Sequence, residues 1–275
     1  MTGVRAFVFG QQNGLQTAWI GRTGPMADFR IKVDTREVQK KLSDLSEKGI
    51  KDATAFALNI TAARCKNALI TEMKSVFDNP TPFTLNAFRV ERASSNKLEA
   101  TIVARDWAAK GTAAGEYLKP QVYGGTRPMK KFEKALSPLS GGQYIVPGPG
   151  ARLDQYGNMS RGQIVQILSR FNLMRDQLQN MSERTAQRLV KQKKNARSQR
   201  SEYFIAREGR NGRPKGIFQL VGKGKVVPVL WFVQKRPTYS VRFKVDEVVD
   251  KTAEAQLPSA IESAIKGAIK RGMGK

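Results

Sequence analysis

The sequence predicts an α+β fold in which an antiparallel sheet packs against long helices, with an extended arm and long loops. One observation behind this prediction is a run of apolar residues at helical spacing between Ile50 and Phe77. A second is a set of short segments in which apolar and polar residues alternate, which is the pattern of half-buried strands. A third is the placement of glycine and proline, which separates these segments with turns and loops.

The first third of the chain predicts an arm followed by two helices. Residues 1–33 contain several glycines and are expected to form an extended arm that ends in a short strand near Phe29–Val33. Thr35 is expected to cap a first helix that ends at Gly49. The helix from Ile50 to Phe77 has two neighbouring apolar stripes. We therefore expect it to be central, with the sheet on one side and helices or a neighbouring subunit on another.

The middle of the chain predicts a hairpin and a long loop. Asn79–Pro82 ends the central helix, because proline cannot continue its hydrogen-bond ladder. Alternating residues on either side of Ser94–Asn96 predict two antiparallel strands between 88 and 105. Residues 107–159 are rich in glycine and are expected to be irregular, apart from a short helix near Met129–Leu136. Loops of this length are usually functional or ordered by a partner.

The second half predicts one more helix, several strands and a C-terminal helix. Ser160 and Gln163 have the spacing of a capping box, so a helix is expected to begin there and to continue towards Leu189. Four strands are predicted at 203–206, 216–221, 226–233 and 239–245. Pro228 predicts that its strand lies at an edge or begins late. An apolar stripe over Ile261–Ile269 predicts a helix at the C-terminus.

These elements suggest a division of the chain into four segments. The segments are an extended arm (1–33), an α+β core that includes the long loop 107–159 (34–183), a basic excursion (184–215), and a strand-rich segment with the C-terminal helix (216–275). The last segment is expected to complete the core.

The charge of the chain points to a polyanion nearby. The sequence has 48 Lys plus Arg against 23 Asp plus Glu, a net charge of +25, whereas solubility needs a net charge of only about 2 to 8. The basic excursion contributes Arg184, Arg188, Lys191, Lys193, Lys194, Arg197, Arg200, Arg207, Arg210, Arg213 and Lys215. These cations are candidates for contact with a phosphate backbone without base specificity, or with an acidic protein surface.

The residue types argue against catalysis. Histidine is absent, which removes the commonest general base and every Ser–His or Cys–His nucleophile pair. Cys65 lies on an apolar helical stripe and is expected to be a core residue. Asp246, Glu247 and Asp250 are expected to open a helix, where acids are favourable. We therefore predict a protein that is not an enzyme and has no catalytic, cofactor-binding or metal-binding residues.

Other candidate motifs have structural interpretations. Gly148-Pro149-Gly150 and Gly222-Lys223-Gly224-Lys225 match no nucleotide-binding fingerprint, and we predict a loop bend and a hairpin turn. Trp231, Phe232 and Tyr239 offer stacking surfaces, but strand alternation predicts that most of them face a sheet core. No apolar run approaches the roughly 20 residues that cross a bilayer, so no membrane partner is expected.

Short blocks of the sequence resemble tail-completion and head–tail joining proteins of tailed bacteriophages, the minor tail proteins of the lambda type. These blocks are the helices ending at Phe77 with the turn 79–84 and hairpin 85–105, then Glu116-Tyr117-Leu118, Tyr123–Pro128, Leu153–Asn158, Ser160–Ile164 and Pro228–Val233. Together they span about residues 35–270.

The resemblance implies a structural virion protein that assembles as a ring at the neck or upper tail. Its expected partners are other copies of itself and neighbouring neck, portal or tail proteins, with channel DNA as a further contact without sequence specificity. The expected location is the virion, after assembly in the host cytoplasm, and no cofactor is implied. The alternative is a sequence-independent nucleic-acid-binding protein that acts through its basic surface outside a particle.

Overall fold

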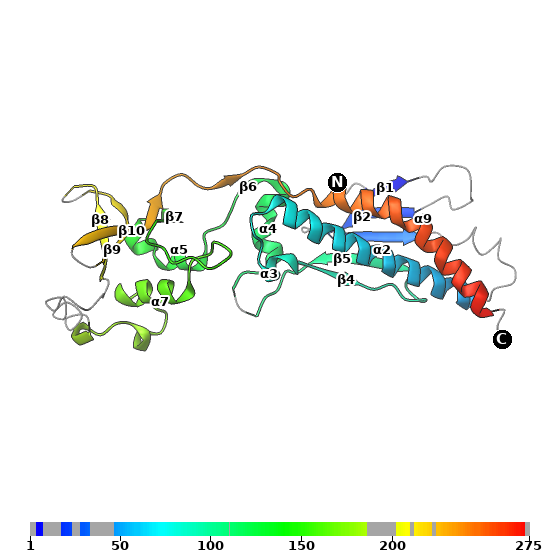
Figure 1. Ribbon diagram of the computed structural model, residues 1–275, viewed down its shortest axis with the longest axis horizontal. Helices are drawn as coiled ribbons and strands as arrows, with labels where there is room; N and C mark the ends of the chain where they lie inside the picture. Colours follow the sequence, from blue (N-terminus) through cyan, green and yellow to red (C-terminus); the bar gives the residue numbers. More distant parts are fainter. Residues whose placement is uncertain are drawn as a thin grey trace. The chain divides into compact units, whose positions relative to one another are not determined.

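The computed structural model describes residues 4–7, 18–23, 28–33, 47–109, 111–185, 202–209, 212–221 and 224–272. The chain divides into two compact units, and the second is inserted in the sequence of the first. The first unit comprises Met1–Gly125 and Ser240–Lys275, and the second comprises Thr126–Tyr239 (Figure 1). Helices and antiparallel sheets occur in both units, which confirms the predicted α+β fold class.

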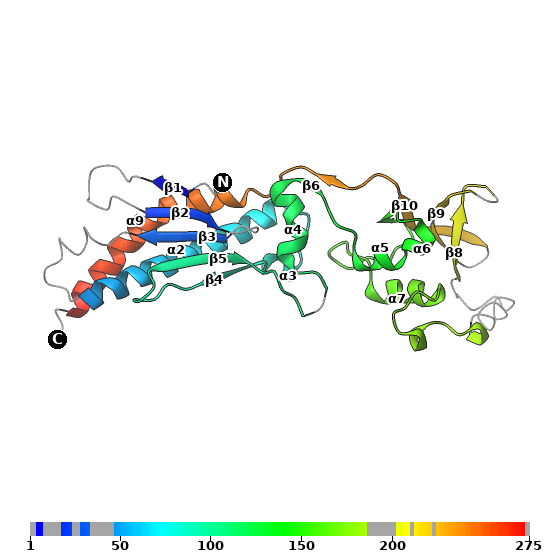
Figure 2. The same cartoon turned by 180° about the vertical axis from the view of Figure 1, so that it is seen from behind.

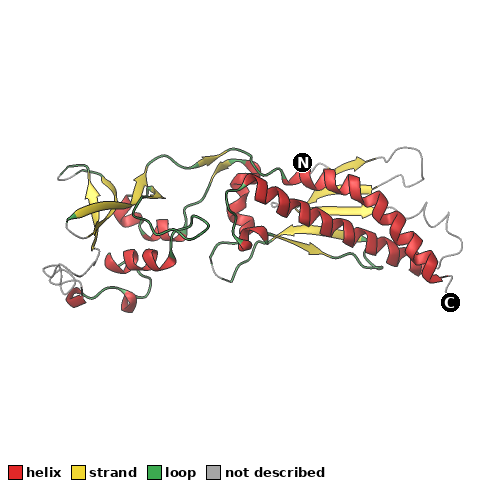
Figure 3. Ribbon diagram, in the orientation of Figure 1, coloured by secondary structure: helices red, strands yellow, loops and turns green. Residues whose placement is uncertain are grey.

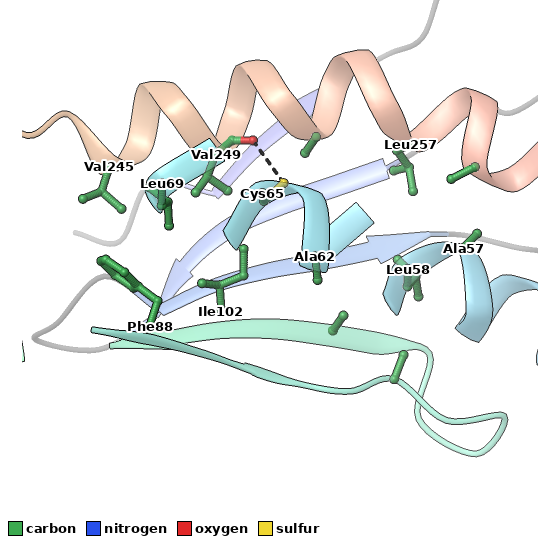
Figure 4. Close-up of a cluster of buried hydrophobic side chains, with 14 of the residues drawn as sticks. Ala57, Leu58, Ala62, Cys65, Leu69, Phe88, Ile102, Val245, Val249 and Leu257 are labelled. Atoms are coloured by element: carbon green, nitrogen blue, oxygen red, sulfur yellow. Dashed lines mark hydrogen bonds between the residues drawn. The ribbon is translucent and has the colours of Figure 1, made fainter. Parts of the chain in front are cut away.

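The first unit is built on two long helices, α2 (Glu47–Val76) and α9 (Val245–Gly272). The helices run antiparallel: Leu69 of α2 lies beside the start of α9, whereas Leu58 lies beside Leu257 (Figure 4). Between these points the Cys65 thiol donates a hydrogen bond to the Val249 carbonyl oxygen over 3.8 Å. The predicted C-terminal helix is confirmed, and it begins earlier than its apolar stripe suggested.

The two helices cover one face of a five-stranded sheet (Figure 2). Its strands are β1 (Val4–Phe7), β2 (Ala18–Thr23), β3 (Asp28–Val33), β4 (Phe88–Glu91) and β5 (Glu99–Ala104). Their order is β1-β2-β3-β5-β4, and all neighbours are antiparallel. Ala100, Ile102 and Ala104 of β5 are buried in the same core as both helices. The central position predicted for the helix that starts near Ile50 is therefore confirmed.

The N-terminal arm differs from the sequence expectation. Where residues 1–33 are described, they form three strands of the sheet instead of an arm with one strand. Residues 34–46, including the predicted cap Thr35, lie outside the described residues. Helix α2 already begins at Glu47 and runs through Gly49, so Gly49 does not end a helix. The apolar residues that follow sustain the helix across this glycine.

Two short helices close one end of the first unit. α3 (Pro82–Leu85) is capped by Thr81, whose hydroxyl accepts a hydrogen bond from the Thr84 N–H over 3.1 Å. The Thr84 hydroxyl and the Tyr117 hydroxyl of α4 (Ala114–Tyr123) lie 2.8 Å apart and are hydrogen-bonded. The predicted hairpin is confirmed by the pairing of Phe88 with Ala104.

The second unit contains a four-stranded antiparallel sheet in the order β7-β10-β9-β8 (Figure 3). Its strands are β7 (Tyr144–Pro147), β8 (Glu202–Arg207), β9 (Pro214–Val221) and β10 (Lys225–Val233). Its helices are α5 (Lys131–Ala135), α6 (Ser137–Ser140), α7 (Arg161–Arg170) and the 3-10 turn η1 (Gln177–Gln179). β6 (Gly125–Thr126) and β11 (Thr238–Tyr239) pair where the chain enters and leaves this unit.

Several sequence expectations in this half are corrected. Residues 107–159 hold α4, β6, α5, α6 and β7 and are not one long loop. The strand predicted over 239–245 stops at Tyr239, because the N–H groups of Arg242 and Phe243 both donate to the Gln121 carbonyl oxygen instead of a strand. The segment 216–275 is divided, since residues up to Tyr239 belong to the second unit.

The helix after Ser160 also differs from its prediction. α7 ends at Arg170 and does not continue towards Leu189, because Asn172 adopts a left-handed backbone with φ of 57°. The predicted capping box is wrong: the Ser160 side chain makes no capping hydrogen bond, and the Gln163 side chain points into the protein.

Pro228 lies in β10, which is a central strand and already begins at Lys225, so the predicted edge position and the predicted late start are both wrong. A register shift between Pro228 and Leu230 accommodates the proline.

Candidate interaction surface

The predicted basic excursion is partly described. Arg188, Lys191, Lys193, Lys194, Arg197, Arg200 and Arg210 lie outside the described residues. Arg184 is exposed in the turn that follows Ser182. Arg207, Arg213 and Lys215 are exposed where β8 ends and β9 begins, so the sheet brings these three predicted cations together.

Two of these cations line a groove at one end of the sheet of the second unit. The groove has a volume of about 260 Å³ and is shallow. Its lining residues are Gln143, Glu208, Arg213, Pro214, Lys215, Trp231, Phe232 and Gln234. The groove therefore combines two cations and an indole ring, with one carboxylate close to them.

Trp231 belongs to an apolar surface on the same sheet. We call this surface the aromatic face, and it carries Val146, Phe204, Phe218, Val226 and Trp231. Phe204 lies directly opposite Phe218 in the sheet, and Val146 lies opposite Trp231. The Phe218 and Trp231 rings meet edge to face, with their centres 5.2 Å apart. The exposed fractions of Trp231, Val146 and Val226 are 38%, 44% and 49%, so this face is open to solvent among the described residues.

The core of the second unit lies on the other side of the sheet. Its buried residues are Leu136, Ile145, Ile167, Tyr203, Ile217, Val229 and Leu230. Ile217 and Leu230 are the sequence neighbours of Phe218 and Trp231, and adjacent residues of a strand point to opposite faces. The aromatic face is therefore not required to build this core.

Two glycines near Trp231 lie close to the backbone of β10. Gly216 lies opposite Trp231 in the sheet, and a Cβ atom there would overlap the carbonyl oxygen of Leu230. A Cβ atom at Gly148 would lie 2.5 Å from the Pro228 carbonyl oxygen and 3.2 Å from the Trp231 indole nitrogen. At both positions the backbone of the glycine approaches β10 too closely to leave room for a side chain.

The Gly148-Pro149-Gly150 segment is the bend that the sequence predicted. The Gly148 N–H donates to the Val229 carbonyl oxygen, and the Gly150 N–H donates to that of Pro228, both over 2.8 Å. The buried Gln163 side chain accepts from the Arg152 N–H over 2.6 Å and donates to the Gly150 carbonyl oxygen over 3.1 Å. These N–H groups are already hydrogen-bonded, so they form no phosphate cradle.

A buried ion pair supports the start of the second unit. The Glu133 carboxylate is fully buried and accepts two hydrogen bonds from the Arg127 guanidinium, over 2.6 and 2.7 Å. It also accepts from the N–H groups of Lys130 and Ile145. Burial by itself would raise the pKa of Glu133, but these hydrogen bonds outweigh it and lower the pKa. Because every partner belongs to the protein, we interpret the pair as structural.

The remaining candidate groups are also structural. Burial, reinforced by the charge of Asp250, raises the pKa of the Cys65 thiol to about 12, so the thiol stays protonated. Asp246 and Glu247 open α9, as predicted. Lys225 pairs with Val221, so β9 and β10 form the antiparallel pair of the predicted hairpin, although Gly222 and Lys223 of its turn lie outside the described residues.

Two further findings concern the described residues alone. No group of three or more metal-binding side chains occurs among them. Within the described ranges, every helix is too short or too polar to cross a lipid bilayer.

Sequence reasoning identified part of this surface. Arg207, Arg213 and Lys215 were candidates, and Phe232 packs against the core as expected. The sequence predicted that most of Trp231, Phe232 and Tyr239 face a sheet core, but Trp231 lies on the opposite face. Phe204 and Phe218 were missed. The sequence does contain a signal, because the face of β9 that carries Gly216, Phe218 and Leu220 has no polar side chain, whereas a solvent-exposed face usually carries polar residues. Comparison with protein-family models, curated proteins and solved structures finds no match.

Proposed function

We propose that the protein is a structural subunit of a tailed-bacteriophage virion, a tail-completion or head–tail joining protein that assembles as a ring at the neck or upper tail. The proposal starts from the sequence blocks that resemble such proteins. In the first unit these blocks form contacts between elements, such as the hydrogen bond between Tyr117 and Thr84. These blocks support a structural role, and the proposal assigns no catalytic residue.

Large apolar side chains exposed on the first unit carry the proposal. Phe56, Phe83 and Trp107 have exposed fractions of 57%, 49% and 76%. Phe56 lies in the N-terminal half of α2, about 30 Å from the C-terminal end of that helix at 1.5 Å per residue. Phe83 lies in α3, which follows that end. Burying such side chains against another subunit is favourable, and exposed apolar patches mark interaction sites.

Two separate apolar positions suit a ring. In a cyclic ring each subunit offers two different surfaces, one to each neighbour. We assign the surface around Phe56 to one neighbour and the exposed side chains of Phe83 and Trp107 to the other. The partners in this proposal are therefore copies of the chain, with portal, neck or tail proteins above and below the ring.

The first test is imaging of purified virions of the phage or prophage that encodes this chain. We expect a ring of this protein at the neck or upper tail, with six-fold or twelve-fold rotational symmetry. Virions that contain no copy of the chain would refute the proposal.

The second test addresses the two surfaces. Phe56→Asp and Trp107→Asp are each expected to block ring closure, because a charge at a buried interface is costly. Thr71→Asp is the matched control, since Thr71 is an exposed polar residue of the same helix α2. Negative-stain microscopy and light scattering should show rings for the control alone, in the presence of the neighbouring virion proteins. Normal rings from both Phe56→Asp and Trp107→Asp would contradict the assigned surfaces.

A further inference from the structure

We propose that the aromatic face of the second unit binds single-stranded nucleic acid. Unpaired bases stack on Trp231 and its neighbouring phenylalanines, while Arg213 and Lys215 contact the phosphates. This binding site does not depend on the virion proposal, because it rests on residues of the second unit alone.

The chemistry of the face fits such a ligand. Trp231 offers an accessible indole ring, and Phe218 and Phe204 continue the aromatic row across two further strands. Stacking on aromatic side chains tolerates any base, because every base has a π face. A flat sheet surface with adjacent aromatic rings is a common platform for unpaired nucleotides.

The charges around the face favour a polyanion. Arg213 and Lys215 line the groove that contains Trp231, and Arg207 is exposed on the adjacent strand. The groove beside Trp231 therefore carries two cations, with a third on the adjacent strand, against the single carboxylate of Glu208.

The same charges argue against a second copy of the chain as the occupant. A face-to-face pair would be isologous, with the same surface on both copies. A pair that places the two Trp231 ends together would bring the cations near Trp231 against the same cations of the other copy, in a protein whose net charge is +25. Phosphate groups would neutralise these cations and release counterions.

Single strands are favoured over duplexes, because paired bases are stacked on each other and hide their faces from Trp231. A duplex offers phosphates to the cations but no free base faces to the aromatic row. A preference for single strands therefore separates this site from simple electrostatic attraction.

The main experiment measures binding of the full-length protein to labelled oligo-dT and to a mixed-sequence duplex by fluorescence anisotropy. Oligo-dT should bind more tightly than the duplex. Trp231→Ala should weaken oligo-dT binding roughly tenfold or more. Val241→Ala is the control, since it removes an exposed apolar side chain from the first unit, and it should leave the affinity unchanged. Equal affinities for both ligands, with no effect of Trp231→Ala, would overturn the proposal.

A second readout does not depend on truncating Trp231. The chain has three tryptophans, so Trp19→Phe with Trp107→Phe leaves Trp231 as the sole indole. Oligo-dT should quench its fluorescence by stacking, whereas the duplex should not. Emission that stays unchanged at saturating oligo-dT would show that bases do not stack on Trp231 and would overturn the proposal.

The third measurement separates charge from stacking. Arg213→Gln with Lys215→Gln should make the slope of log K against log salt shallower by about 1.4, at about 0.7 per phosphate contact. Lys74→Gln with Lys97→Gln removes the same charge from exposed positions of the first unit and should leave the slope unchanged. Two other results would overturn the proposal. One is equal changes in slope for both pairs. The other is no binding of oligo-dT at low salt, with Trp231→Ala instead dissociating a protein complex in light scattering.

Discussion

At the scale of single residues, Glu133 shows how a buried charge is held. Its carboxylate accepts hydrogen bonds from Arg127, from Lys130 and from Ile145, all in the second unit. Glu133→Gln would leave the Arg127 guanidinium, which is 15% exposed, without its counter-charge. Breaking a buried pair in this way costs about 3–5 kcal/mol. We expect the free energy of unfolding of the second unit, measured with urea, to fall by that amount.

The exposed ion pair between Glu262 and Lys266 on α9 provides the control. Glu262→Gln should change the unfolding midpoint little, because solvent screens exposed pairs. A double variant, Arg127→Leu with Glu133→Leu, should lose less stability than Glu133→Gln, since it leaves no unpaired charge. If Glu133→Gln and Glu262→Gln had equal effects, the buried pair would not stabilise the second unit.

The Cys65 thiol predicts a loss of stability in alkali. Its pKa is about 12 in the folded chain, against 9.0 for an unperturbed thiol. Because the folded pKa is raised, the stabilisation is complete below pH 9.0 and is lost as the pH rises from 9.0 towards 12. In that window the unfolded state gains a thiolate that the core excludes, at about 1.4 kcal/mol per pH unit.

Cys65→Ala should remove this dependence. Urea unfolding of the wild type and the variant at several alkaline pH values should give a shallower decline for Cys65→Ala, although its stability near neutral pH is lower because a cavity remains. Parallel declines would show that the thiol does not stay protonated in the folded protein.

The hydrogen-bond partners of single polar residues could not be predicted from the sequence. Asn59 is a polar residue of α2, and its side-chain amide pairs with both the N–H and the carbonyl oxygen of Ala93. Gln163 resembled a capping residue and instead holds the loop at Gly150. Each partner is distant in sequence, so the local pattern contains no sign of it.

At the scale of elements, apolar periodicity predicted α2, the hairpin β4–β5 and the strands β8, β9 and β10. It failed over residues 239–245, where alternation suggested a strand. Phe243 is fully buried there, but Val241 is 50% exposed, and the backbone bonds to Gln121 instead. Alternation reports which side chains are buried, whereas a strand also needs a neighbouring strand for its hydrogen bonds.

The pairing of β9 and β10 depends on Gly216. Gly216→Ala would place a methyl group against the Leu230 carbonyl oxygen, so the strands must separate or shift. We expect it to destabilise the second unit by roughly 1–3 kcal/mol, as for other overpacked sites. Gly267→Ala on α9 is the matched control: its Cβ meets nothing within 4 Å, and the helix should gain about 0.5–1 kcal/mol. Thermal unfolding that shifts in the same direction for both variants would contradict this account.

At the scale of the whole molecule, the sequence predicted the fold class but not the division into units. The expected boundaries followed changes in composition, at 34, 184 and 216. The observed division follows contacts between distant segments, because α2 packs on α9 across the inserted residues 126–239. Because both units have an apolar core, the amino-acid composition does not change where the second unit is inserted.

This division predicts that the first unit folds without the second. β6 and β11 pair where the chain crosses between the units, so a short Gly-Ser linker can join Gly125 to Ser240. The core of the first unit draws its buried residues from 53–118 and 243–268 and takes none from the inserted residues. We expect the shortened chain to be soluble, to unfold cooperatively in urea and to protect the amides of α2 and α9 in hydrogen exchange. Rapid exchange throughout both helices would show that the first unit requires the insertion, because each helix depends on the packing of the other for its stability.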